Sequence, residues 1–102
     1  MDTVRITDHI NGTALNEDGY ALFVVWDARV QRREPFVLSL ADVGPMSSSF
    51  LNSSFGELIR KYGFGVLKRY LRLTDYRKTD IKRLGDYFKM VREEEQDGPV
   101  VA

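Results

Sequence analysis

Residues 36–51 read FVLSLADVGPMSSSFL and carry the strongest pattern in the chain. The run 36–43 is short, nearly continuous in apolar side chains and rich in β-formers, which is typical of a strand covered on both faces. Gly44-Pro45 ends that run, and the serines that follow stand where a helix would begin. Beyond them, apolar side chains recur at helical spacing at Leu51, Phe55, Leu58, Ile59 and Tyr62. The stretch therefore predicts a strand, a polar turn and a helix that packs on a sheet.

The flanking segments continue this alternation. Residues 4–10 alternate apolar and polar side chains with the period of a half-buried strand. Residues 21–33 match both a helix and a strand, and we favour a helix because the pattern runs too long for a typical strand before Pro35 stops it. Residues 66–73 predict a further strand, and residues 79–91 carry the apolar stripe of a last helix.

This order predicts an α/β fold, with a small, mostly parallel or mixed sheet of about four strands and three helices packed on it. The 102 residues, 43% of them hydrophobic, suit one domain, which we expect over residues 1–92, with a flexible acidic tail over 93–102. Cysteine is absent, so thiolate chemistry and disulfides are excluded. Uninterrupted apolar runs fall short of the roughly 20 residues that cross a bilayer, so we expect no membrane association and a cytoplasmic location.

The charge is zero overall but unevenly distributed. Residues 60–92 hold 11 basic and 3 acidic side chains, a net charge of +8, between two segments of −4 each. One interpretation is that amphipathic elements carry solvated basic faces. The alternative is an anion-binding or nucleic-acid-binding module. Its candidate residues are Arg69, Arg72, Arg77, Lys78 and Lys82.

Catalytic groupings are scarce in the sequence. His9 is the single histidine, and nothing in the sequence brings it near a serine as nucleophilic catalysis would require. The sequence also lacks the ligand spacing of a zinc site, a phosphate-binding glycine loop and a dinucleotide fingerprint. We therefore expect a protein that is not an enzyme and that holds neither a metal nor another cofactor.

The serines at 47–49 have two interpretations. In the first, one serine caps the helix that follows and the others pack in a tight turn. In the second, one hydroxyl is a phosphorylation switch, because a phosphate adds about −1.5 to −2 charge that a bound partner would feel as repulsion.

The segment 36–43 followed by Met46-Ser47-Ser48-Ser49-Phe50-Leu51 resembles the STAS domain of bacterial anti-sigma factor antagonists. Ser47 to Leu51, together with Phe55-Gly56 and Leu58, is similar to the STAS-like families of the DUF4325 type. In the antagonists, an Asp-Ser-Ser-Gly-Leu pattern ends the strand and its first serine is phosphorylated. The resemblance aligns Ser48 with that serine, while Ser47 replaces the aspartate and Phe50 replaces the glycine.

The resemblance implies a regulatory module that docks a partner protein, either a histidine-kinase-like ATPase or an anti-sigma-type protein. Ser48 is then the candidate for phosphorylation. The implied partner-binding residues are Ser47, Ser48, Ser49, Phe50, Asn52 and Ser53.

Overall fold

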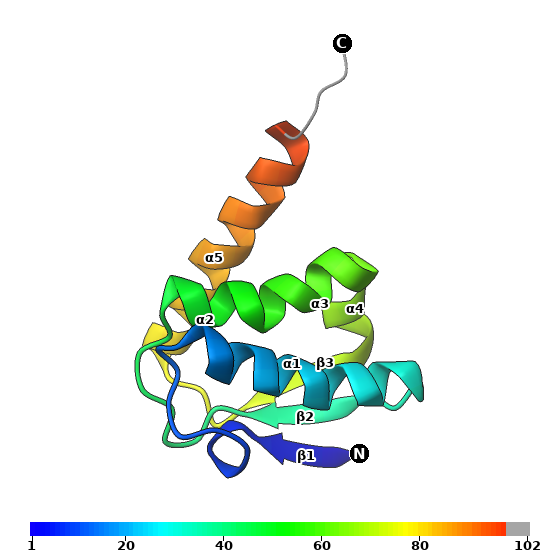
Figure 1. Ribbon diagram of the computed structural model, residues 1–102, viewed down its shortest axis with the longest axis vertical. Coiled ribbons are helices and arrows are strands. Elements are labelled where there is room, and N and C mark those ends of the chain that lie inside the picture. Colours follow the sequence, from blue (N-terminus) through cyan, green and yellow to red (C-terminus); the bar gives the residue numbers. More distant parts are fainter. Residues whose placement is uncertain (98–102) are drawn as a thin grey trace.

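The computed structural model describes residues 1–97, with the side chains described as far as residue 94. The centre of the fold is a three-stranded parallel sheet in the order β1-β2-β3 (Figure 1). The strands are β1 Asp2–Arg5, β2 Phe36–Ser39 and β3 Leu71–Thr74. The molecule is therefore a small α/β domain, in which parallel strands need helical crossovers.

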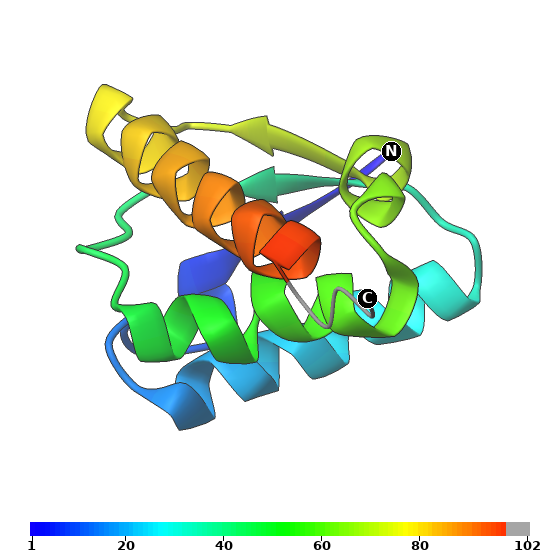
Figure 2. The same ribbon diagram turned by 90° about the horizontal axis from the view of Figure 1, so that it is seen from above.

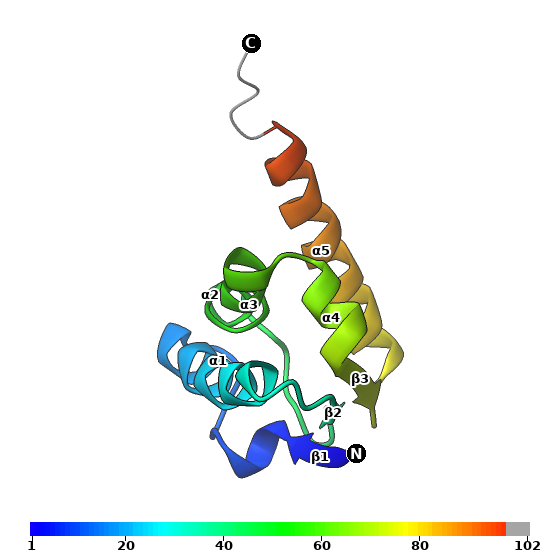
Figure 3. The same ribbon diagram turned by 90° about the vertical axis from the view of Figure 1, so that its right-hand side faces the viewer.

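Five α-helices and one 3₁₀ helix connect and follow the strands within residues 1–97. They are η1 Ile6–Asp8, α1 Asn16–Gln31, α2 Ser48–Ser53, α3 Phe55–Tyr62, α4 Gly65–Tyr70 and α5 Lys78–Asp97. All five α-helices lie on one side of the sheet (Figure 3). Seen from above, α1 runs beside the line of α2 and α3, and α5 lies on the other side of that line (Figure 2).

The core fills the space between the sheet and these helices. Val4, Phe36 and Leu38 of the first two strands are buried, at 2% exposure or less. Trp26 of α1 packs against Phe55 of α3, with ring centroids 4.8 Å apart. Such contacts bury the apolar stripes that make the helices amphipathic, and this burial is the main favourable term in folding.

The prediction of about four strands and three helices is close but not exact, since residues 1–97 form three strands and five α-helices. One difference lies in residues 66–73. Only Leu71–Thr74 forms a strand, whereas Gly65–Tyr70 is helix α4. Val66 is buried and Leu67 and Tyr70 are partly buried, which is a helical spacing that the β-forming character of these residues concealed. Tertiary packing therefore overrode the local preference for a strand.

The predicted helix after the serines is divided in two. Ser54 ends α2 with φ −107° and ψ −88°, and its hydroxyl donates to the carbonyl oxygen of Phe50 at 2.7 Å. The Ser53 hydroxyl donates to the carbonyl oxygens of Ser49 and Phe50, at 3.0 and 3.2 Å. Serine hydroxyls compete with the helical backbone for its carbonyl groups, which explains the break.

The other elements match the expected types but differ in extent. Residues 21–33 are helical as expected for most of their length, and α1 begins earlier, at Asn16. β1 ends at Arg5, so Ile6 and Ile10 are buried through a 3₁₀ turn rather than a strand. β2 ends at Ser39, earlier than the apolar run suggests.

Helix α5 runs to Asp97, so residues 93–97 of the expected tail are helical, and residues 98–102 lie outside the described residues. Leu84 and Tyr87 of α5 are buried, while Ile81 of the expected apolar stripe is 41% exposed. Phe88 of α5 packs edge-on against Phe55, with 5.6 Å between ring centroids. None of the helices in residues 1–97 is long and apolar enough to cross a membrane.

Candidate functional site

The carboxyl ends of the parallel strands meet at one edge of the sheet, where polar groups join β2 to β3. The Ser39 hydroxyl donates to the Asp75 carboxylate at 2.6 Å, and the backbone N–H of Leu40 donates to the carbonyl oxygen of Thr74 at 3.0 Å. The chain then leaves the sheet through residues 40–47, which we call the serine loop. This is the edge at which open α/β sheets usually hold their functional groups.

The segment that precedes α1 holds the serine loop from one side. The Thr13 hydroxyl donates to the carbonyl oxygens of Pro45 and Gly44, at 2.8 and 3.2 Å. In return, the backbone N–H of Ser47 donates to the carbonyl oxygen of Thr13 at 3.0 Å, and the Ser47 hydroxyl donates to that of Ala14 at 2.6 Å. Thr13 is itself buried, so these bonds are shielded from competing water.

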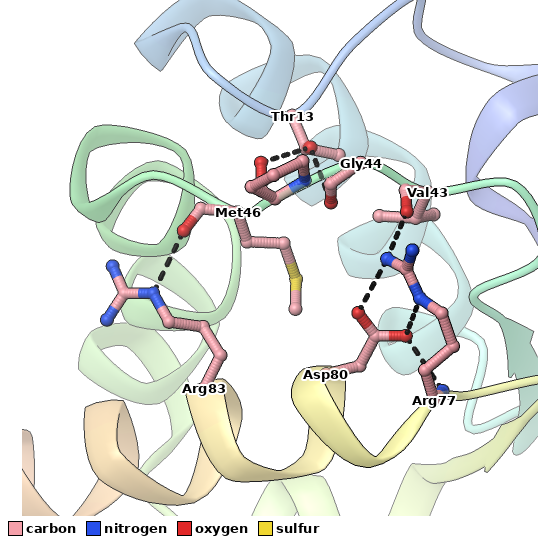
Figure 4. Close-up of polar contacts among 8 residues, drawn as sticks. Thr13, Val43, Gly44, Met46, Arg77, Asp80 and Arg83 are labelled. Atoms are coloured by element: carbon pink, nitrogen blue, oxygen red, sulfur yellow. Dashed lines mark hydrogen bonds and ion pairs between the residues drawn. The ribbon is translucent and has the colours of Figure 1, made fainter.

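Two arginines hold the loop from the other side (Figure 4). Arg77, just before α5, donates to the carbonyl oxygen of Val43, and Arg83 of α5 donates through Nε to that of Met46 at 2.9 Å. Arg83 Nη2 also reaches Ser48 Oγ at 3.1 Å. The loop is therefore fixed by side chains from two segments that are far from it in the sequence.

Asp80 orients the first of these arginines. Its buried carboxylate lies 3.0 Å from Arg77 Nη2 and accepts the backbone N–H of Arg77 at 2.9 Å. Burial alone would raise the pKa of Asp80, but the hydrogen bonds and charge of Arg77 outweigh it and hold the pKa below its ordinary value. Asp80 therefore stays ionised and keeps the guanidinium directed at the loop.

Helix α2 begins where the loop ends, and Ser47 is its N-cap. The Ser47 hydroxyl oxygen accepts the backbone N–H of Phe50 at 3.0 Å, which confirms the interpretation that one serine caps the helix. Ser48, Ser49 and Asn52 of α2 are exposed, so they form the outer surface of this helix. We call these three residues the α2 surface.

Two expected partner-binding residues are not on that surface. Phe50 is fully buried and Ser53 is 5% exposed, so neither side chain can touch a docked protein while the fold is intact. This part of α2 packs on α1, where Gly19 allows the close approach: an ideal Cβ on Gly19 would lie 2.0 Å from Ser53 Oγ and 2.4 Å from the backbone oxygen of Phe50. The structure therefore places Phe50 and Ser53 in the core and not on the exposed side of α2, because the direction of α2 is set by its packing on α1.

The exposed Asn52 is held from behind by α5. The hydroxyl of Tyr87 donates to Asn52 Oδ1 at 2.8 Å, and burial chiefly raises the pKa of Tyr87, so the phenol stays protonated as a donor. Gly56 makes room for this contact, since an added Cβ would meet the Tyr87 oxygen at 2.4 Å. The nearest neighbour of Gly56 is therefore a side chain of α5.

The basic residues of the predicted anion site are held in different local environments. Arg69 lies on α4, whereas Arg72 of β3 donates to the carbonyl oxygens of Lys68 and Leu71. Arg77 pairs with Asp80, while Lys82 pairs with Asp86 at 3.2 Å. Lys78 and Lys82 line one surface hollow near the start of α5, together with the exposed Tyr76 and Ile81. Pairing with carboxylates leaves less of this charge for an anion than the sequence count suggests.

The structure gives no further support to catalysis by His9. This side chain is exposed after η1, and among residues 1–94 it makes no hydrogen bond with a serine. The side chains searched for metal ligands, those of the described residues, contain no group of three that could hold an ion.

A polar cluster on α1 and α3 escaped the sequence analysis. Asp27 accepts hydrogen bonds from Lys61 Nζ at 2.8 Å, from the Tyr62 hydroxyl and from Gln31 at 3.1 Å. Burial alone would raise the pKa of Asp27, but these donors, with Lys61 foremost, hold it below its ordinary value. The available signal was spacing, since Asp27 stands four residues after Phe23 and three before Val30, on the buried side of α1.

A three-stranded parallel sheet with helices on one side, and a capped helix after its central strand, define a small α/β domain. The family described as STAS-like domain of unknown function (DUF4325) matches residues 27–80, which is 54 of the 102 residues, and the chain belongs to this family. The match confirms the resemblance read from the serine segment. No curated protein and no solved structure matches the chain.

The matched segment runs from the second half of α1 to the first turn of α5. It includes the serine loop, the α2 surface and both Asp27 and Asp80. It excludes β1, Thr13 and Arg83, so part of the clamp on the loop comes from residues outside the matched segment.

Proposed function

We propose that this chain is a non-catalytic regulatory module of the cytoplasm that docks a partner protein through the α2 surface and the adjoining serine loop. The observation that carries the proposal is the combination of rigidity and exposure at one place. Thr13, Arg77 and Arg83 fix the backbone of the loop, while Ser48, Ser49 and Asn52 remain exposed beside it. A surface that is already ordered loses little conformational entropy when a partner binds.

Ser48 is the residue at which such a surface could be switched. Its hydroxyl is exposed and close to the Arg83 guanidinium, at 3.1 Å. A phosphate there would add about −1.5 to −2 charge, which Arg83 would neutralise only in part. The remaining negative charge would face the docked protein, and like charges or desolvation at that contact would weaken the complex.

The proposed partner is a histidine-kinase-like ATPase or an anti-sigma-type protein, as the STAS-like class implies. The natural candidates are such proteins encoded next to this chain. Binding of each purified candidate to the wild-type protein and to Ser48→Asp is measured by isothermal titration calorimetry. We expect Ser48→Asp to weaken binding at least about tenfold.

Ala28→Glu provides the matched control because it adds the same charge at an exposed residue in the second half of α1, away from the α2 surface and the serine loop. The control should bind like the wild type, and both variants should keep the wild-type circular dichroism spectrum. Phe50 is unsuitable for this test because its burial makes a charged substitution a folding defect. Equal affinity of the wild type and Ser48→Asp for every partner found would refute the docking surface.

Phosphopeptide mass spectrometry after incubation with the same ATPases and ATP tests the switch separately. The proposal expects phosphate on Ser48 and not on the neighbouring Ser49. A separate titration with a labelled oligonucleotide tests the nucleic-acid alternative. Binding that weakens steeply as the salt concentration rises would favour it.

A further inference from the structure

A surface pocket lies at the opposite edge of the sheet from the serine loop, where the strands begin. It has a volume of about 640 Å³ and lies between the end of α1 and the α3–α4 segment. Its lining consists of Val30, Arg33, Tyr62, Gly65, Val66, Arg69 and Tyr70. Pockets that bind small molecules commonly measure about 300 to 1,000 Å³, so this one has the size of a ligand site. In Figure 1, the serine loop lies at the left of the molecule and α4 at the right.

Two arginines line the pocket, and the protein itself does not neutralise them. Neither Arg33 nor Arg69 forms a salt bridge with a side chain in the described part of the chain, and no carboxylate lines the pocket. Two acids stand close to lining residues, and both are occupied: Asp27 by Lys61 and Tyr62, and Glu34 by Arg32 at 3.0 Å. Two unpaired guanidiniums beside one cavity attract an anion, and their planar donors suit a carboxylate or a phosphate.

The remaining walls suit an apolar body. Val30 and Val66 are buried, at 6% and 5% exposure, and so form apolar surface at the base of the pocket. Tyr62 and Tyr70 add aromatic surface, and Asp27 holds Tyr62 in place through its hydroxyl. A ligand with a flat or aliphatic body could cover these groups while its anionic end meets the arginines.

Arg33 occupies a conformation that arginine rarely adopts. Its φ is 57°, in the left-handed region, just beyond the last turn of α1. Its backbone N–H donates to the carbonyl oxygen of Val30 at 2.9 Å, and that of Glu34 donates to Arg29 at 3.0 Å, which closes the helix. Glycine or asparagine would meet this geometry with less strain, and strained residues concentrate at functional sites.

We propose that this pocket binds a small organic anion, with a carboxylate or phosphate at Arg33 and Arg69 and an aromatic or aliphatic body against Val30, Val66 and the tyrosines. The site is separate from the α2 surface. The inference does not depend on the proposed docking function, because it rests on the lining of the pocket alone.

Titration of the ¹⁵N-labelled protein, followed by two-dimensional NMR, tests the proposal with four probes. Phenyl phosphate and benzoate carry both an anion and a ring, inorganic phosphate carries only the charge, and benzyl alcohol carries only the ring. We expect the first two to produce saturable shifts at the amides of Arg33, Gly65 and Arg69. Inorganic phosphate and benzyl alcohol should bind at least about tenfold more weakly, because each lacks half of the complementarity.

Substitution of the arginines distinguishes a specific anion-binding site from nonspecific electrostatic attraction. Arg69→Ala and Arg33→Asn should each lower the affinity for phenyl phosphate about tenfold. Asparagine is chosen at position 33 because it tolerates the positive φ. Arg5→Ala is the control, since Arg5 is exposed on β1, has no salt bridge within residues 1–94 and lies outside the pocket. The spectrum of each variant reports whether it is folded.

Three results would overturn the proposal. Shifts that do not saturate, or that scatter over the whole surface, would mean that no pocket site exists. If Arg5→Ala lowered the affinity for phenyl phosphate as much as Arg69→Ala does, the binding would depend on net charge and not on the pocket. Inorganic phosphate binding as tightly as phenyl phosphate would refute the role given to Val30, Val66 and the tyrosines.

Discussion

Replacing Gly19 by alanine is the most direct test of how α1 and α2 pack. An ideal Cβ on Gly19 would lie 2.0 Å from Ser53 Oγ and 2.4 Å from the carbonyl oxygen of Phe50. The serine hydroxyl could rotate away, but the Phe50 oxygen belongs to the backbone of α2 and cannot. Gly19→Ala therefore forces the two helices apart, and it disturbs the contact that buries Phe50.

The expected change in the free energy of unfolding is the balance of two terms. Alanine is favoured over glycine within a helix by up to about 1 kcal/mol, and Gly19 is in the first turn of α1. Overpacking a well-filled contact costs about 1 to 3 kcal/mol, and a clash with backbone lies at the upper end or beyond. We expect Gly19→Ala to lower the free energy of unfolding by about 2 kcal/mol, a large part of the stability of a small domain.

Gly85→Ala is the matched control because Gly85 is also inside a helix, α5, but has no heavy atom within 4 Å of an added Cβ. This variant should gain the full helix-propensity term, about 1 kcal/mol. The two substitutions, chemically identical, are therefore expected to change stability in opposite directions.

Urea denaturation followed by circular dichroism measures both effects. With slopes of about 1 to 3 kcal/mol per molar urea, Gly19→Ala should lower the midpoint by about 1 M, and Gly85→Ala should raise it. Adding Ser53→Ala to Gly19→Ala should restore only part of the loss, because the contact with Phe50 remains. A Gly19→Ala protein as stable as the wild type would refute the close packing of α1 on α2.

Two further predictions concern the serine loop and its clamp. Ser47→Ala should destabilise the protein by about 1 kcal/mol in urea denaturation, because the N-cap bond is lost, while Ser49→Ala should have little effect since the Ser49 side chain is exposed. The lowered pKa of Asp80 contributes stability above the ordinary carboxyl pKa of 3.8, and that contribution is lost as the pH falls through the folded pKa. Asp80→Asn should therefore lose stability at neutral pH and show a shallower acid decline than the wild type, whereas Asp86→Asn, at an exposed pair, should change the stability at neutral pH little.

Local sequence patterns were sufficient to predict the strand and the capped helix in the middle of the chain. The apolar run at 36–43 predicted β2, although Ser39 ends it earlier, and the serine that follows was correctly expected to cap a helix. Both depend on interactions within a few residues, namely burial of consecutive apolar side chains and one hydroxyl bonded to the next turn. The family resemblance rested on the same segment, and it was confirmed.

The candidate site depended on contacts that no local pattern contains. Thr13 and Arg83 reach the serine loop from 31 to 37 positions away along the chain, so their role becomes visible only when the chain is folded. The pocket beside Arg33 and Arg69 likewise joins the end of α1 to α4. Both belong to arrangements of helices that residue spacing does not define.

The sequence by itself determined the α/β class, the strand before the serines and the helix that Ser47 caps, because burial period and capping act over a few residues. Tertiary structure decided which face of α2 is outward, since close packing at Gly19 turns Phe50 and Ser53 into the core and leaves Ser48 exposed. It also decided which basic side chains of residues 60–92 are paired with carboxylates and on which elements the others lie. Carboxylates pair with Arg77 and Lys82, whereas Arg69 lies on α4 and Arg72 on β3.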